Sequence, residues 1–209
     1  MEINKEDLEN YPNRYRATLI NSLSGIKTAV LVGTQSKEGV TNLAIFNSLI
    51  HIGANPPRYG LLFRPDTVRR HTLENILAAK EYTLNYLTAK NASKAHQTSA
   101  KYSDGFSEFD MIGFEPVFKE VSSAPFVADA IVKIAMQFEE RIDININGTI
   151  LIVGRLVNIE VDKKLIKEDG FVALHELDLL ACSGLDAYYS TSFLGRYRYA
   201  KPEQHPEML

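Results

Sequence analysis

The chain of 209 residues has a single cysteine, no excess of basic residues and no long apolar run. One cysteine cannot form an intramolecular disulfide, which predicts a reducing environment. The formal net charge is −3, so the chain lacks the excess of basic residues that is typical of a nucleic-acid-binding protein. No apolar stretch approaches the ~20 residues of a membrane-spanning helix, and the polar start MEINKEDLEN is unlike a signal peptide. We therefore expect a soluble, cytoplasmic protein that binds neither nucleic acid nor membrane.

The sequence also lacks the local motifs of several enzyme classes. The patterns G-x-S-x-G, G-x-G-x-x-G and G-x-x-x-x-G-K-[ST] are missing, which removes the usual support for a hydrolase, a Rossmann domain or a P-loop. The five histidines have no partners at metal-ligand spacing, so we expect no metal site. They are His51, His71, His96, His175 and His205.

Individual reactive side chains are more typical of structural roles. Cys182 lies in an apolar stretch that suits a small buried hydrophobe. His96 is expected on a helix surface, and His175 beside Glu176 fits a structural role better than acid–base catalysis. We assign no catalytic side chain, and an enzyme of this kind would need a cofactor to supply reactivity.

What the sequence does contain is a strong strand pattern. The apolar run Lys27–Thr34 is typical of a buried strand, and the pair Asn147-Gly148 between isoleucines is a strong hairpin signal. Val127–Met136 fits a helix or a strand equally well. The predicted strands are Lys27–Thr34, Thr41–Ser48, Tyr59–Phe63, Tyr82–Leu87, Ala135–Ile146 and Thr149–Glu160. This pattern predicts a mainly β fold, a closed or nearly closed antiparallel β-barrel with peripheral helices.

Helices and loops are expected between and around these strands. Leu73, Ile76 and Leu77 form the apolar face of a helix over Leu73–Lys80, with Thr72 as its N-cap. A second helix is expected over Asn91–Ser99. The glycine-punctuated segment Lys101–Gly113 is predicted to be a loop of the kind that often forms a lid.

No repeat, low-complexity segment or linker divides the chain. Apolar and charged fractions of 45% and 23% are those of an ordinary globular protein. We predict one domain over residues 1–209, with a core of about residues 21–199 and a polar N-terminal lead in which Pro12 interrupts a short helix. The aromatic segment Tyr188–Tyr199 is expected to be ordered, and the short C-terminal tail Pro202–Leu209 to fray.

Positive charge is crowded at the start of the helix expected over Leu73–Lys80. The residues concerned are Arg64, Arg69, Arg70 and His71. The helix dipole is positive there, so cations are unfavourable, and a bound phosphate would explain them. Alternatively, they form a solvated face that Asp66 and Glu74 partly offset. The small side chains of Ala44 and Ser48 on the preceding strand leave room for a flat ligand, or for a closely packed helix.

Taken in order, five segments resemble the flavin reductase-like family, whose members adopt the FMN-binding split β-barrel. The resemblance spans about Asn21 to Tyr199. The segments are TNLAIFNSLIHIGANPPRYGLLFRPDTVRRHTLENI, EYTLNYL, AHQTSAKYSDGFSEFDMIGFEP, NGTILIVGRLVNIEVD and SGLDAYYSTSFLGRYRY. The resemblance implies FMN held at a homodimer interface.

The resemblance also implies which residues would contact the cofactor. The strand that approaches the flavin ring carries over onto Asn42, Leu43, Ala44, Phe46, Asn47 and Ser48. The phosphate site carries over onto Arg64, Arg70, His71, Thr72 and Asn75. The loop Phe106–Phe109 would lie near the site. Tyr188 and Tyr189 match an aromatic tail, although Leu185 replaces a glycine of the family pattern.

The implied activity is hydride transfer from NAD(P)H to FMN, with electrons passed to a small-molecule or protein acceptor. Hydride transfer requires no side-chain acid or base, in keeping with the missing catalytic motifs. Two alternatives stay open. One is a flavoredoxin-like, FMN-binding electron carrier reduced by a partner protein, and the other is a flavin-binding module without redox activity.

Overall fold

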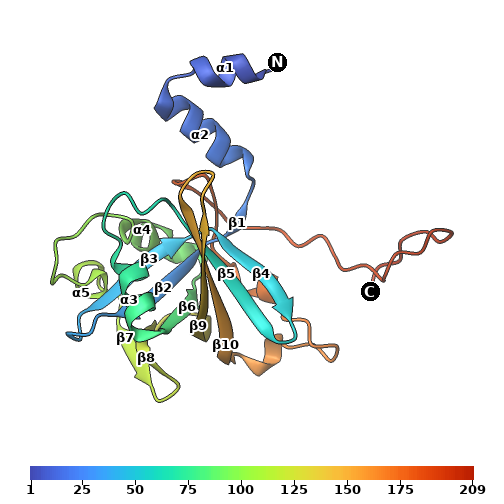
Figure 1. Cartoon of the computed structure of the whole chain (residues 1–209). Coiled ribbons are helices and arrows are strands. Elements are labelled where there is room, and N and C mark those ends of the chain that lie inside the picture. The colour runs from blue at the N-terminus through green and yellow to red at the C-terminus, as the bar shows by residue number, and fades with distance from the viewer.

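The computed structural model describes residues 1–209 and is built mainly from β-strands (Figure 1). A seven-stranded antiparallel sheet has the order β3-β2-β6-β9-β10-β5-β4. Its strands are β2 (Val30–Gln35), β3 (Thr41–Phe46), β4 (Leu49–Ala54), β5 (Pro57–Phe63), β6 (Glu81–Tyr86), β9 (Val132–Ile144) and β10 (Thr149–Val161). The edge strands β3 and β4 are joined through Asn47 and Ser48 but do not pair. The mainly β prediction is confirmed.

Smaller elements surround this sheet. The remaining strands are β1 (Lys27–Thr28), β11 (Ala181–Ser183) and β12 (Ala187–Tyr189), which form a second sheet, and the hairpin β7 (Pro116–Lys119) and β8 (Ser122–Val127). The α-helices are α1 (Lys5–Asn10), α2 (Asn13–Leu23), α3 (His71–Ala79), α4 (Ala92–Gln97) and α5 (Glu108–Ile112). Three 3₁₀ turns are η1 (Ala89–Asn91), η2 (Lys163–Leu165) and η3 (Leu174–Leu177). No helix combines the length and the apolar character needed to cross a membrane.

Two apolar clusters pack against opposite faces of β2. Val30 and Val32 join side chains of β5, β6, β9, β10 and α3 in one cluster, so the sheet curls around a common interior. Leu31 points the other way, into a cluster closed by Ala95 of α4 and Phe109 of α5. Because successive side chains of a strand point to opposite faces, a strand buried on both sides reads as an unbroken apolar run. That is the pattern seen at Lys27–Thr34.

The long hairpin of β9 and β10 confirms the signal at Asn147-Gly148. Thr149 pairs with Ile144, and Gly148 takes a positive φ of 72°, which glycine adopts without a steric penalty. The ambiguous segment Val127–Met136 is resolved into the end of β8 and the start of β9. Strand β9 starts earlier than predicted because Val132 and Ile134 already face the interior.

Several local predictions are wrong. Residues 13–23 form helix α2 directly after Pro12, whose fixed φ suits a helix start; no residue of α2 is buried, so its apolar periodicity is weak. Strand β4 was missed because its side chains are mostly exposed. The predicted loop Lys101–Gly113 contains α5, where the Ser107 hydroxyl accepts a hydrogen bond from the Phe109 N–H.

The cap of α3 is also different from the prediction. The helix begins at His71, with Arg70 as an N-cap that makes no side-chain capping bond. Thr72 is instead buried in the first turn, because its hydroxyl is turned inward and accepts a hydrogen bond from Asn42.

Both ends of the chain lead away from the sheet (Figure 1). Helices α1 and α2 project from the body without burying a residue. The C-terminal segment is anchored where the Phe193 ring stacks on His175, with centroids 3.8 Å apart, which gives His175 a structural role. Arg196 also pairs with Asp169 at 2.5 Å.

Candidate functional site

A cavity of about 840 Å³ lies where β3 passes into β4. Its walls come from β3, the end of β5, the start of α3, the segment between α4 and α5, and the turn between β11 and β12. The structure therefore brings most of the predicted site residues to one cavity. Those lining it are Asn42, Ala44, Phe46, Asn47, Ser48, Arg64, Arg70, His71 and Thr72.

Two predicted residues do not line this cavity. The Leu43 side chain belongs to the apolar cluster on the opposite side of β3. Asn75 is buried behind the first turn of α3, where its amide donates to the Thr34 hydroxyl at 3.1 Å. The amide of Asn42 donates to the same hydroxyl and to Thr72, at 3.2 and 3.0 Å. This buried network fixes the first turn of α3 against β3.

The connection between β3 and β4 is held by its own side chains. The Asn47 amide donates to the Gly184 carbonyl at 2.7 Å, which ties this connection to the turn between β11 and β12. The Ser48 hydroxyl donates to the Leu62 carbonyl, also at 2.7 Å. These bonds fix the connection, whose two residues line the cavity, to the turn between β11 and β12 and to β5.

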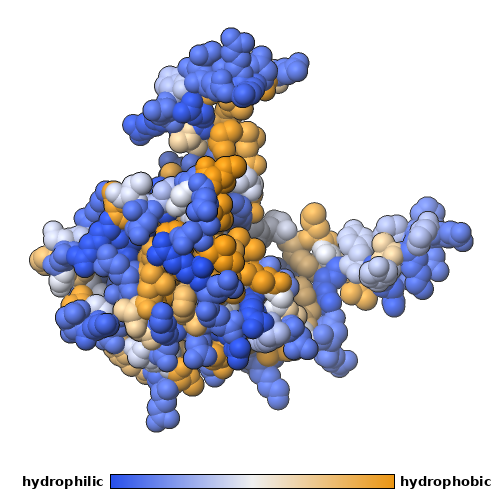
Figure 2. Space-filling view, viewed as in Figure 1, coloured by the Kyte–Doolittle hydropathy of each residue, from blue (hydrophilic) through white to orange (hydrophobic).

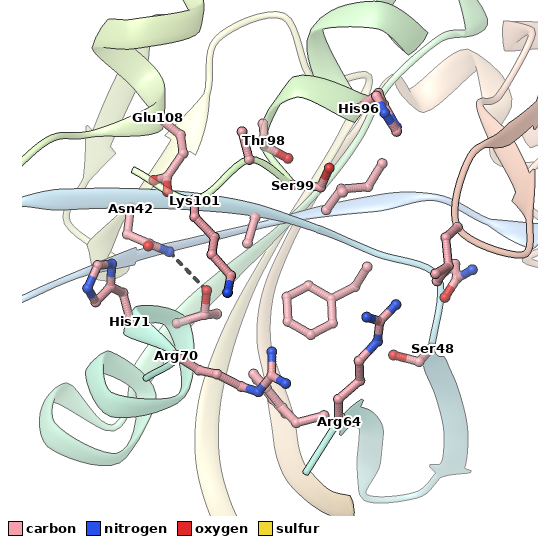
Figure 3. A pocket seen from close by; sticks show the side chains of 18 of the residues that line it. Asn42, Ser48, Arg64, Arg70, His71, His96, Thr98, Ser99, Lys101 and Glu108 are labelled. Atoms are coloured by element: carbon pink, nitrogen blue, oxygen red, sulfur yellow. Dashed lines mark hydrogen bonds between the residues drawn. The ribbon is translucent and has the colours of Figure 1, made fainter. Parts of the chain in front are cut away.

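Unpaired positive charge is concentrated on one side of the cavity. Arg64, Arg70 and Lys101 extend into it from different segments (Figure 3). None of them takes part in an ion pair; the Arg70 guanidinium donates only to the Pro65 carbonyl, at 3.1 Å. Arg69 differs, because Glu74 and Asp104 neutralise it. The solvated-face interpretation thus fits Arg69, whereas the others are placed to bind an anion.

Lys101 is a cavity residue that the sequence did not indicate. It is carried by the segment between α4 and α5, which is fastened to the start of α3. Asp104 in that segment contacts His71 Nε2 at 3.0 Å and pairs with Arg69. The hydrogen bond from His71, followed by the charge of Arg69, lowers the pKa of Asp104. No local periodicity reveals such a contact, because it joins residues more than 30 positions apart.

Glu108 is a buried acid on the cavity wall. Its Oε2 accepts a hydrogen bond from the Leu43 N–H at 2.9 Å, which occupies a backbone donor of edge strand β3. Burial raises the pKa of Glu108, and the Leu43 bond opposes this only in part. Of the loop expected near the site, Glu108 lines the cavity, while Phe109 is fully buried in the core and Phe106 is exposed.

A second group of titratable side chains lies on another part of the wall. His96 of α4 and Tyr188 of β12 both line the cavity, and His96 Nδ1 lies 2.9 Å from Tyr188 Oη. The thiol of Cys182 is nearby on β11, paired with Tyr188 across the two strands. Burial raises the pKa of both the Cys182 thiol and the Tyr188 phenol, the latter to about 12. His96 is therefore at the cavity and not simply on a helix surface.

Comparison with known proteins places this geometry in a family. Residues 23–177 match the model described as a flavin reductase like domain. A Shewanella frigidimarina protein, provisionally assigned as a flavin reductase with a split barrel domain, is 42% identical, with a TM-score of 0.91 over 96% of this chain and 100% of that chain. An uncharacterised Halalkalibacterium halodurans protein is 27% identical over 94% of this chain and 96% of its own length.

More distant structures share the same fold. Nitrilotriacetate monooxygenase component B from Bacillus cereus is 20% identical, with a TM-score of 0.81 over 92% of this chain and 96% of that chain. The split β-barrel predicted from the sequence is therefore confirmed.

Proposed function

The chain belongs to the flavin reductase-like family, and from this we propose that it is an FMN-dependent oxidoreductase that takes hydride from NADH or NADPH. The observation that carries the proposal is the set of unpaired cations, Arg64, Arg70 and Lys101, in one cavity beside the start of α3.

The donor set suits a terminal phosphate. Near neutral pH a phosphate monoester carries between one and two negative charges and three acceptor oxygens. Two guanidinium groups and an ammonium group supply matching charge and donors, and no carboxylate competes for them. The first turn of α3 adds the favourable end of a helix dipole without a side-chain cap. These features favour FMN over riboflavin, which lacks the phosphate.

The β3 wall suits the ring of the cofactor. Ala44 contributes a small side chain, and Asn42, Asn47 and Ser48 are held in place by the hydrogen bonds described above. When bound, FMN would supply the two-electron chemistry, and the protein would bind the cofactor, orient it and limit the access of water. No side chain of the cavity has to act as a nucleophile.

We also propose that the protein functions as a homodimer. Exposed apolar side chains continue from the sheet onto the N-terminal arm (Figure 2). They include Ile50 and Ile52 of β4, Ile20 and Leu23 of α2, and Ile26. An isolated helix of this length is marginal in water, so a second copy that covers α2 would stabilise it. Sedimentation equilibrium measures the mass in solution, and a monomer at all concentrations would contradict this proposal.

The cofactor proposal is tested by an absorbance spectrum of the protein after FMN addition and desalting. Flavin bands that remain with the protein support the phosphate site. Stopped-flow bleaching by NADH or NADPH then distinguishes an oxidoreductase from an electron carrier, which would stay oxidised until a protein partner is added. Loss of all added FMN on desalting, together with no saturable FMN binding, would refute the proposal.

A further inference from the structure

We infer that His96, hydrogen-bonded to Tyr188, delivers a proton to the molecule that is reduced in the cavity. This inference rests on the proposed oxidoreductase function, because it assigns a role within the same site. It adds a residue to a reaction that otherwise needs no side-chain acid.

The pair is formed by tertiary structure. His96 and Tyr188 are 92 positions apart, yet Nδ1 and Oη lie 2.9 Å from each other. The rings meet edge to face, with centroids 5.6 Å apart and planes at 83°. His96 makes no other side-chain hydrogen bond, so its Nε2 is unoccupied. Figure 3 shows His96 on a different part of the wall from Arg64 and Arg70, which leaves it available to a molecule other than the phosphate.

Tyr188 is suited to hold the imidazole in both of its protonation states. Burial, followed by the nearby Cys182 and Asp186, raises the pKa of Tyr188 to about 12, so its hydroxyl stays neutral. A neutral hydroxyl accepts from a protonated Nδ1 and donates to an unprotonated one, so its contact with Nδ1 is kept when Nε2 gives up its proton. The groups that face the pair are Cys182 of β11 and Asp186 of the turn between β11 and β12.

Two other titratable side chains of the cavity already hold hydrogen-bond partners. His71 uses Nε2 to contact Asp104, and Glu108 uses Oε2 to accept the Leu43 N–H. His96 differs from His71 because its ring contacts a neutral hydroxyl and no carboxylate, and its Nε2 is free; histidine is the side chain that exchanges protons near neutral pH.

The proton completes the balance of a two-electron reduction. A hydride carries one hydrogen nucleus and two electrons, and its addition to the acceptor, with the reduced flavin as the donor, would leave negative charge on a heteroatom of that acceptor. The N–H bond at His96 Nε2 then breaks, its electron pair stays on the ring, and the proton forms a bond to that heteroatom. Water returns a proton to the imidazole.

The test compares two acceptors in the FMN-loaded protein, with NADH as the reductant. Reduction of menadione adds a hydride, which is one proton with two electrons, and then a second proton. Ferricyanide takes up one electron and no proton. We expect H96Q to lower kcat with menadione by about 100-fold, a typical contribution of general acid catalysis, and to leave kcat with ferricyanide unchanged. The ratio of the wild-type rate to the H96Q rate should therefore be about 100 with menadione and about one with ferricyanide.

The controls separate this role from a structural one. H205Q, which changes a histidine in the exposed C-terminal tail, should match the wild type with both acceptors. Equal losses with both acceptors in H96Q, or an unchanged menadione rate, would overturn the inference. Failure of the wild type to bind FMN or to reduce either acceptor would instead refute the proposed function.

A measurement on the flavin-free protein is independent of activity. NMR spectroscopy of the imidazole C–H groups identifies the His96 signal as the one that is missing from H96Q. We expect Y188F to change the chemical shift of the His96 signal, because the hydroxyl partner is lost, and FMN to change it as well. A His96 signal that responds to neither change would also overturn the inference.

Discussion

Replacing Arg70 with alanine should weaken FMN binding through the loss of one charge-assisted contact. Arg70 is half-buried at the start of α3, and its guanidinium donates only to the Pro65 carbonyl. A hydrogen bond to a charged group contributes about 1.5–3 kcal/mol. Since each 1.4 kcal/mol is a factor of about ten, we expect the Kd for FMN to rise by roughly 10- to 150-fold in R70A.

Riboflavin gives the internal comparison. It has the same ring without the phosphate, so its Kd should be equal in R70A and in the wild type. The matched control is R141A, because Arg141 pairs with Asp143 on β9 and does not line the cavity. R70K should fall between R70A and the wild type, since lysine keeps the charge but not the planar fork of donors.

The assay is quenching of flavin fluorescence at low and at moderate ionic strength. The FMN affinity of the wild type should decrease with salt more steeply than that of R70A, because salt screens charge interactions. An unchanged Kd for FMN in R70A, or equal losses for FMN and riboflavin, would show that the phosphate does not bind at Arg70.

The remaining predictions concern stability and the loop. G154A should lower the free energy of unfolding by about 1–3 kcal/mol, measured by urea titration, because an added Cβ would lie 2.2 Å from the buried Tyr82 hydroxyl; equal midpoints for G154A and the wild type would contradict the packing. Burial raises the pKa of Glu108 above 4.5, so its contribution to stability is complete below that pH and is lost as pH rises through the raised value. The flavin-free E108Q protein should therefore lose less stability than the wild type over that pH range, and parallel curves would refute this. The lowered pKa of Asp104 means that its ion pairs stabilise the loop above the ordinary aspartate range and are lost as pH falls through the lowered value. At neutral pH, D104N should be cleaved by trypsin at Lys101 faster than the wild type, and equal rates would show that the Asp104 contacts do not restrain this segment.

Local sequence patterns predicted the structure correctly where burial or a tight turn restricted the residue types of a short segment. The run Lys27–Thr34 is mostly apolar because β2, which begins within it at Val30, is buried on both faces; Lys27 and Thr28 instead form β1 in the smaller sheet. Asn147-Gly148 predicted the longest hairpin because only a few residues can adopt the backbone of a tight turn. The same signals failed at α2 and β4, whose side chains are mostly exposed and carry little periodicity.

The sequence by itself determined the strand-rich fold class, the family resemblance and the cationic start of α3, because these depend on neighbouring residues. Only the tertiary structure showed which of those cations are unpaired: Arg69 is neutralised from a distant segment, and Lys101 arrives from the same segment. It also brought His96 and Tyr188 together. The physical reason is that such contacts depend on strand order and on packing between remote elements, which leave no periodic pattern in the local sequence.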